Sequence, residues 1–344
     1  MGDKSPIQWT EATWNPLAAF DRDTGKRGWF CTKVSDGCTH CYAEKLNVRL
    51  GNGHLYRVGN LSKIEWRLVN IDQPIRWKRP RMIFVNSMTD LFHQDVPDDY
   101  IAQVFAVMQL ASHHTFQVLT KRTLRMRDLL TSDEFVRAID DYRATVQPDC
   151  RDFVWPIPNV HIGTSVEHQV AADERVPLLL QTPAAIRFLS CEPLLGAVNL
   201  TPWIISGSDE CPEGDPDCEA PDDGEWHDHS ACEPCGLHWV IVGGESGLGA
   251  RPFRLSWARS LIAQCKESGT AVFVKQLGAN IHCRNDNGFD GDTPSAWPDG
   301  IDPDRVTGDF SYQGGDVRVQ VRDTKGGDVR EWPEDLRVRE MPTV

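Results

Sequence analysis

Six short apolar runs, most of them followed by a segment with helical periodicity, constrain the fold of this chain more than any other feature. The runs are rich in β-branched and aromatic residues and cover 81–87, 116–120, 159–165, 186–190, 239–244 and 271–276. Runs of this kind are typical of strands that are buried on both faces. Strands that alternate with helices predict right-handed crossovers and a parallel sheet.

Two of the intervening segments have clear helical features. In the segment that follows Asp98, apolar residues recur at helical spacing: Ile101, Phe105, Met108 and Ala111. A second helix is predicted to begin near Ser256, a candidate N-cap, and to stop at Gly269. Six strands, plus a short strand before Cys31, predict an α/β fold of the partial (β/α)6 barrel type with parallel strands.

Two segments depart from the alternation. Residues 206–237 are acidic, rich in Pro and Gly, and hold four cysteines, so they are predicted to form an insertion between two strands. Residues 284–344 are dominated by Gly, Asp, Pro and Trp and are predicted to be an irregular extension anchored by Trp297 and Trp332. We therefore expect a barrel over 1–283 that the insertion interrupts.

Polar residues follow each of the six runs, at the point where the predicted strand ends. They lie at 86–90, 120–122, 164–167, 190–192, 243–246 and 275–276. One or two such positions would be helix caps, but six of them favour a functional site. Parallel α/β folds place their sites at the carboxyl ends of the strands, so these residues are predicted to converge.

The charge and the cysteine content narrow the class of protein. The sequence has no run of eighteen apolar residues and no basic-then-apolar start, so we expect no membrane segment and a cytoplasmic location. Eleven cysteines without an export signal indicate metal binding rather than disulfides. The formal charge of −14 argues against a nucleic-acid partner, but eleven Asp and Glu lie within 206–237 and leave −3 for the rest, which is −14 plus 11. Two basic clusters, 76–81 and 121–127, are equally consistent with a solvated surface and a phosphate-binding patch.

The stretch CTKVSDGCTHCYAE, residues 31–44, places three cysteines in the spacing C-x6-C-x2-C. A fourth thiol or histidine would complete a closed zinc site, but His40 lies between two of the ligands and is poorly placed to reach the same ion. Three thiolates on a four-iron cluster leave one iron open, and an open iron is a place for a small molecule to bind.

A second group of four cysteines lies in the acidic insertion: Cys211, Cys218, Cys232 and Cys235. Their spacing can close on a structural zinc ion, which would supply folding free energy to a segment too polar to fold alone. A second iron–sulfur cluster and a disordered loop with incidental thiols are the alternatives.

The three-cysteine stretch resembles the cluster loop of radical S-adenosylmethionine enzymes, whose commonest form has three residues between the first two cysteines rather than six. Nearly all of the chain outside the insertion resembles a family of phage-encoded three-Cys-motif proteins, on the segments IQWTEATWNP, CTKVSDGCTHCYAE, FVNSMTDLFHQDVP, VLTKR, IRFLSCEPLLG, WVIVGGESG, FVKQLG and EWPEDLRVREMP. The TD after the second strand and the TK after the third are more weakly similar to spore photoproduct lyases, which act on DNA.

This resemblance implies a cofactor set and roles for the strand-end residues. It implies a 4Fe-4S cluster on Cys31, Cys38 and Cys41, with S-adenosylmethionine at the open iron and a 5′-deoxyadenosyl radical generated by one electron from the cluster. The methionyl and ribose groups are expected to contact Asn86, Ser87, Thr89 and Asp90. The middle of the site is expected to contain Ser165, Glu167, Ser190 and Glu192.

The stretch Gly243-Gly244-Glu245 is similar to the GGE of radical enzymes, which follows the second strand and meets the amino group of the cofactor. Here it follows a late strand, so we expect these residues to bind cofactor or substrate. A turn that needs close backbone approach is the alternative.

The catalytic candidates are Cys191, Lys121, Glu192 and Lys275. Each lysine ends an apolar strand, so it either pairs with Glu192 or Glu245 or binds a carboxylate or phosphate of a ligand. Cys191 is either a hydrogen-donating thiol or a buried structural cysteine, and the structural role is favoured.

The leading hypothesis is a radical S-adenosylmethionine-type enzyme that modifies or repairs a nucleic acid or nucleotide. It would need an electron donor, and the phage resemblance implies the cytoplasm of a phage-infected or prophage-bearing bacterium and a phage-encoded partner protein. The alternative is a non-catalytic iron–sulfur or zinc protein that engages nucleic acid or a protein partner.

Overall fold

The predicted strands form one parallel sheet. The computed structural model describes residues 5–148, 153–204, 236–284, 316–319 and 321–342. Seven strands lie in the order β1-β5-β6-β7-β8-β9-β11, and every neighbouring pair is parallel. Their bounds are β1 (Ala12–Trp14), β5 (Met82–Val85), β6 (Thr115–Thr120), β7 (Val160–Ser165), β8 (Ile186–Cys191), β9 (Trp239–Gly243) and β11 (Ala271–Gln276). All six predicted strands are confirmed, and β1 is the short strand expected before Cys31.

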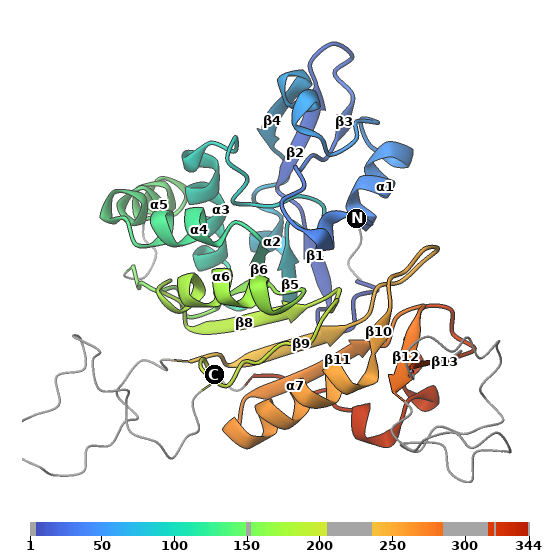
Figure 1. Ribbon diagram of the computed structural model, residues 1–344. Coiled ribbons are helices and arrows are strands. Elements are labelled where there is room, and N and C mark those ends of the chain that lie inside the picture. The colour runs from blue at the N-terminus through green and yellow to red at the C-terminus, as the bar shows by residue number, and fades with distance from the viewer. Residues whose placement is uncertain (1–4, 149–152, 205–235, 285–315, 320, 343–344) are drawn as a thin grey trace, which may run out of the picture.

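The sheet curls into half of a barrel, and its helices lie on the outer side (Figure 1). These helices are α3 (Asp98–Leu110), α4 (Thr123–Leu130), α5 (Asp133–Val146), α6 (Gln169–Leu180) and α7 (Leu255–Ser268), whereas α1 (Tyr42–Leu50) and α2 (Gln73–Arg76) belong to a second unit. The predicted partial (β/α) barrel is therefore confirmed. Because all seven strands run in the same direction, their carboxyl ends meet along one edge.

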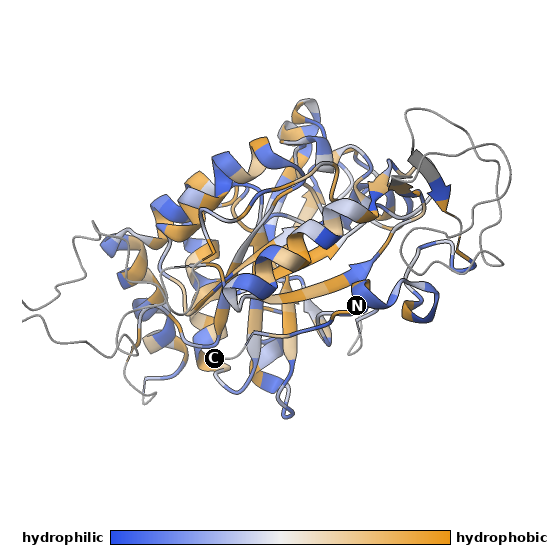
Figure 2. Cartoon of the chain, turned by 60° about the horizontal axis from the view of Figure 1, so that its bottom comes forward, coloured by the Kyte–Doolittle hydropathy of each residue, from blue (hydrophilic) through white to orange (hydrophobic). Residues whose placement is uncertain are grey.

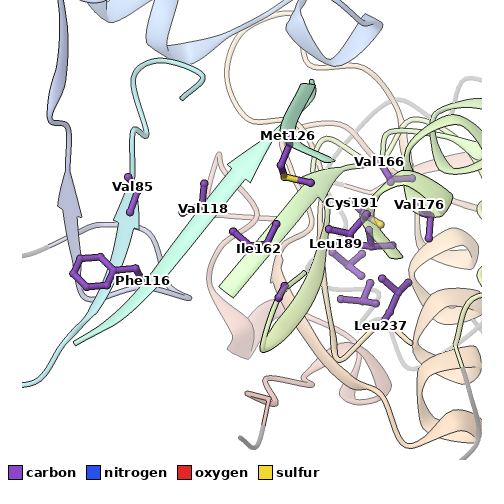
Figure 3. Packing of buried hydrophobic residues seen from close by; sticks show 14 of the residues in the cluster. Val85, Phe116, Val118, Met126, Ile162, Val166, Val176, Leu189, Cys191 and Leu237 are labelled. Carbon is purple, nitrogen blue, oxygen red and sulfur yellow. The ribbon is translucent and has the colours of Figure 1, made fainter. Parts of the chain in front are cut away.

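The larger core lies between the sheet and the helices. Every residue of β7 and β8 is buried, as expected of strands covered on both faces. Figure 2 shows the contrast between the hydrophobic strands and the hydrophilic outer sides of the helices. Figure 3 shows part of this core, where Val118, Ile162 and Leu189 come from neighbouring strands.

Aromatic side chains fill the inner side of the half-barrel toward the amino ends of its strands. Trp9 packs there with its ring centroid 4.8 Å from Phe84 and 6.1 Å from Trp239. Further along the same face the residues become polar, and Ser165 of β7 lies opposite Ser190 of β8 in the register. The aromatic cluster therefore fills one end of the interior, and the polar part of the interior lies at the carboxyl ends of the strands.

A second unit of structure separates β1 from β5. It contains the antiparallel sheet of β2 (Leu17–Asp21), β3 (Arg27–Gly28) and β4 (Ile64–Leu68), in the order β3-β2-β4. Two 3-10 helices, Asp36–Cys38 and Val58–Lys63, complete this unit together with α1 and α2. The three-cysteine stretch belongs to this unit, which the sequence alone did not predict.

The described part of 284–344 is more regular than predicted. β13 (Asp316–Val319) pairs with β12 (Ile281–Arg284), which also pairs with β10 (Phe253–Arg254). Two 3-10 helices follow, Val329–Glu331 and Glu334–Leu336. The Trp332 anchor is confirmed, because this side chain is 2% exposed and its indole nitrogen donates to the Gly326 carbonyl at 3.0 Å. Trp297 and nearly all of 206–237 lie outside the described residues.

The two predicted helices are present with one difference. Four residues on the predicted face of α3 are buried: Ile101, Phe105, Met108 and Ala111. The α7 helix ends at Gly269, which has a left-handed φ of 73°. Ser256 is not its N-cap, because α7 begins at Leu255 and Arg254 occupies the cap position. Within the described ranges, none of the helices combines the length and apolar character needed to cross a membrane.

Candidate functional site

The cysteine loop, residues 31–41, lies across the carboxyl ends of the parallel strands. Three strand-end side chains bind it: Arg122 after β6 contacts Thr32, Glu167 after β7 contacts Ser35, and Glu245 after β9 contacts His40. These contacts join residues that are 90, 132 and 205 positions apart in the sequence. The predicted convergence of strand-end residues is therefore present, and the loop lies over them.

The first attachment is made by Arg122 and Asp90. Arg122 donates from Nη2 to the carbonyl and the hydroxyl oxygen of Thr32, both at 2.9 Å. Asp90 accepts from Arg122 Nη1 at 2.8 Å, and from the Thr120 hydroxyl at 2.7 Å. Its carboxylate also accepts from the backbone amides of Phe92 and Lys121. Asp90 therefore positions Arg122, and both side chains are only 10% exposed.

The second attachment is made by Glu167, whose side chain is fully buried. Its carboxylate accepts from the Ser35 hydroxyl at 2.7 Å and pairs with Lys121 at 3.2 Å and Arg175 at 2.9 Å. Burial alone would raise the pKa of Glu167, but the two cations and the hydroxyl outweigh it and lower the pKa. A methyl group on Gly37 would come within 2.3 Å of Oε1 of this carboxylate. The loop therefore needs glycine where it crosses Glu167.

The third attachment is made by Glu245. Its carboxylate accepts from three nitrogens of Arg251 at 2.8 to 3.1 Å, and its Oε2 lies 3.0 Å from Nδ1 of His40. Burial, which would raise the pKa of Glu245, is outweighed by these hydrogen bonds, and the pKa falls to about 2. Arg251 also donates to the Asp36 carbonyl at 2.8 Å. Glu245 therefore holds the loop directly through His40 and indirectly through Arg251.

The three sulfurs have different neighbours. Cys31 Sγ lies 3.6 Å from Arg122 Nη1, and Cys38 Sγ lies 3.7 Å from the Ser35 hydroxyl. Cys41 is the N-cap of α1, where burial raises its pKa although backbone amides of the first turn act to lower it. Burial also raises the pKa of Cys31 to about 12, against the attraction of Arg122. Burial therefore disfavours the thiolate form of both Cys31 and Cys41.

The three cysteines of the loop, none of them in a disulfide, supply the ligand type that iron–sulfur clusters use. Among the described residues, no group of three or more His, Cys, Asp or Glu is close enough together to hold a single metal ion. His40 contacts Glu245 through its Nδ1, so this ring nitrogen is engaged with a carboxylate. The donor set therefore suits an iron–sulfur cluster.

The turn after β5 holds unsatisfied polar atoms. Asn86 is buried with a left-handed φ of 54°, and neither its Oδ1 nor its Nδ2 has a hydrogen-bond partner among the described residues. The hydroxyl of Thr89 likewise has none. This turn adjoins the cysteine loop, because Tyr42 donates its hydroxyl to the Ser87 carbonyl. Buried amides are normally satisfied, so these atoms fit a bound polar ligand.

The polar residues of β7, β8 and β11 form the remaining part of the edge. Ser165 and Ser190 are buried side by side in the register of β7 and β8. Glu192 pairs with Lys275 of β11 at 2.5 Å, and these side chains are 18% and 16% exposed. A methyl group on Gly243 would lie 3.2 Å from Glu192. Glu192 also accepts from the side-chain amide of Gln276 at 3.4 Å, so the contacts of this pair lie within the strand ends rather than in the cysteine loop.

Three predictions need correction or restriction. Lys275 pairs with Glu192 as anticipated, but Lys121 pairs with Glu167 rather than with Glu192 or Glu245. Gly244 is explained by close packing, because a methyl group there would lie 2.2 Å from the Leu277 carbonyl.

The third prediction to be restricted is the catalytic role of Cys191. It is 0% exposed and points into the helix-side core (Figure 3). Burial raises its pKa, and residues alternate across a strand, so it faces away from Ser190 and Glu192. Its placement favours the structural role over the catalytic one.

The second cysteine group was predicted to bind zinc. All four of its members, Cys211, Cys218, Cys232 and Cys235, lie outside the described residues.

Several residues of the site were not predicted. Arg175 and Arg251 hold the two glutamates, while Ser35 and His40 receive the loop contacts. No sequence pattern marks them: Arg175 and Arg251 lie 8 and 6 residues from their glutamates, at spacings without a motif, and Ser35 and His40 meet partners 132 and 205 positions away. Among the residues that hold the loop, Arg122 was noted in the sequence only as a member of the basic cluster 121–127.

Comparison with known proteins adds one match. A family model described as a protein of unknown function, DUF5131, matches residues 4–328. Neither a curated protein nor a solved structure matches the chain.

Proposed function

Because the chain belongs to the DUF5131 family of proteins of unknown function, we propose its activity from the site: a radical S-adenosylmethionine-type iron–sulfur enzyme. The observation that carries this proposal is the placement of Cys31, Cys38 and Cys41 on one loop over the carboxyl ends of a parallel half-barrel. Parallel α/β folds bind their ligands at this edge. The unpartnered amide of Asn86 beside the loop adds a place for a polar ligand.

The residues of this chain would hold and shield the reacting groups. A cluster on the three cysteines, with S-adenosylmethionine at its open iron, would supply the electron and the 5′-deoxyadenosyl radical. Asn86 and Thr89 would donate to or accept from the polar groups of that cofactor. Phe30, Ala43 and Met88 form an apolar cluster against which Cys31 and Cys41 pack, and this side excludes water from the sulfurs.

The Glu192–Lys275 pair supports a role toward substrate. Its two side chains face the interior from β8 and β11 and are partly exposed, whereas Glu167 and Glu245 are used to hold the loop. A lysine in this position can bind a carboxylate or phosphate when a ligand displaces its glutamate. We assign these two residues to the substrate side of the site.

We propose a nucleic acid as the substrate class, with a nucleotide as the smaller alternative. The cluster 121–127 gives little support, because its cations pair with Glu167, Asp90, Asp98 and Asp128. The support comes from 76–81, where Lys78 and Arg79 are exposed. That segment precedes β5, at the opposite end of the strand from Asn86. A basic surface remote from the cysteine loop favours a polymer over a single nucleotide.

The test of the enzymatic proposal is anaerobic purification followed by iron and sulfide analysis. The wild-type protein should show a charge-transfer absorption in the visible range and should release 5′-deoxyadenosine from S-adenosylmethionine under dithionite. Cys38→Ala should abolish both, while Cys265→Ala, a buried cysteine on α7, should retain both. Zinc in place of iron at the three cysteines would contradict the proposal and favour a non-catalytic metal protein.

The substrate proposal has a separate test. Fluorescence anisotropy with single-stranded and double-stranded oligonucleotides should show binding that weakens with salt. Arg79→Ala should weaken it and reduce the salt dependence, whereas Arg137→Ala on the exposed side of α5 should leave it unchanged. Equal binding by the two variants would contradict the assignment of 76–81 as the nucleic-acid surface.

A further inference from the structure

The guanidinium of Arg122 contacts the sulfur of Cys31. Its Nη1 lies 3.6 Å from Sγ and also donates to Asp90 at 2.8 Å. Its Nη2 donates to two oxygens of Thr32 at 2.9 Å. The backbone amide of Arg122 is held as well, by the Thr120 hydroxyl at 2.9 Å. With this set of bonds the cation is fixed beside one sulfur.

The other two sulfurs lack this cation. The neighbour of Cys38 is the neutral hydroxyl of Ser35 at 3.7 Å, and Cys41 lies at the amino end of α1. Positive charge is therefore distributed unequally over the three ligands. Since the Arg122 and Asp90 side chains are only 10% exposed, water screens this charge poorly.

Resting on the iron–sulfur function proposed above, we propose that Arg122 sets the reduction potential of the cluster through the sulfur of Cys31. Reduction adds one electron from an external one-electron donor, so the cluster and its thiolates gain one negative charge and no bond is broken. A fixed cation bonded to a ligand sulfur stabilises the more negative form, which raises the potential. Arg122 is a positioning and tuning residue in this proposal, because it acts through Cys31.

Asp90 acts in the opposite sense. Its carboxylate lies against the same guanidinium and offsets part of the positive charge that Cys31 experiences. Removing the charge of Asp90 should therefore raise the potential, while removing the charge of Arg122 should lower it. A general loosening of the site would move both variants in the same direction, so the opposed signs distinguish tuning from damage.

The experiment measures midpoint potentials of reconstituted protein by redox titration followed by electron paramagnetic resonance. Arg122→Gln should shift the reduction equilibrium by roughly tenfold toward the oxidised form, which is about 59 mV for a one-electron couple. Asp90→Asn should shift it toward the reduced form. Arg127→Gln is the matched control, because Arg127 lies on α4, the helix that begins directly after Arg122, and pairs with Asp128; it should keep the wild-type potential.

The outcomes are separable from those of the proposed function. An Arg122→Gln protein with full iron content and the wild-type potential overturns the tuning proposal, as does a shift of Arg122→Gln and Asp90→Asn in one direction. If Arg122→Gln binds no iron, Arg122→Lys replaces it: a smaller fall than tenfold together with a rise in Asp90→Asn supports the proposal, and any other combination overturns it. A wild-type protein without iron overturns the proposed function itself.

Discussion

The hydroxyl of Ser35 donates to the carboxylate of Glu167 at 2.7 Å, across 132 residues of sequence. This contact links the cysteine loop to the carboxyl end of β7. Glu167 also neutralises Lys121 and Arg175 within the same buried group. One carboxylate therefore serves both the sheet and the loop, and it makes the two units of the fold depend on one another.

Replacing Glu167 by Gln should lower the free energy of unfolding by about 3–5 kcal/mol, because two partly buried cations lose their counter-ion. Urea denaturation followed by circular dichroism measures this loss. Glu174→Gln, at an exposed position on the neighbouring helix α6, should stay within about 0.5 kcal/mol of wild type. If the free energy of unfolding falls equally little in both variants, Glu167 does not hold the two units of the fold together.

Gly37→Ala should weaken iron binding. The added methyl group would come within 2.3 Å of the Glu167 carboxylate, which three partners hold in place, so the loop has to shift. The ratio of iron to protein after anaerobic reconstitution should fall by at least about half if the shift separates the sulfurs. Gly59→Ala is the control, since nothing lies within 4 Å of its added methyl group. Full iron content in Gly37→Ala would show that the loop tolerates the displacement.

Glu245 should make the stability of the protein depend on pH in acid. Its pKa of about 2 in the folded protein lies below the ordinary value of about 4.3 for an unfolded glutamate. The ionised form is therefore favoured by folding, and this stabilisation is present above pH ~4.3 and is lost as the pH falls toward 2. The difference in unfolding free energy between wild type and Glu245→Gln should shrink between pH 5 and 2.5, which urea titrations can follow. A flat curve for Glu245→Gln would refute the prediction.

Cys191→Ala should separate the two roles of that thiol. In the structural role, removing one buried sulfur costs about 1 kcal/mol in unfolding free energy and leaves iron content and 5′-deoxyadenosine release at wild-type levels. In the catalytic role, product formation on the substrate would be lost while stability changed little. The helix-side position of Cys191 leads us to expect the first result.

The sheet was predictable because its signal is local. Each strand of six buried residues, such as β7 and β8, is marked by a continuous apolar run that needs no knowledge of its partners. The antiparallel sheet of β2, β3 and β4 was missed, because β3 has only two residues and β4 mixes apolar residues with the charged Glu65 and Arg67. Short strands of mixed polarity give no periodic signal.

The edge of the sheet on which the site lies was predictable, but the pairing of its side chains was not. The polar residues after each strand indicated convergence, and the Lys275–Glu192 pair followed from the rule that a buried lysine needs a partner. The partner of Lys121 could not be chosen in this way, because three glutamates end neighbouring strands and only the register decides which of them lies nearest. Arg122 was interpreted as part of a basic surface, although Asp90 and Thr32 draw it under the cysteine loop.

The attachment of His40 to Glu245, 205 residues later, has a consequence for how the protein is made. During translation the cysteine loop leaves the ribosome long before β9 has been synthesised. The loop is then without Glu167 and Glu245, the residues after β7 and β9 that hold it. If the loop binds the proposed cluster, metal delivery into a correctly spaced set of sulfurs would have to wait until translation has passed Glu245. Until then, a cell making this protein has to keep three accessible thiols reduced.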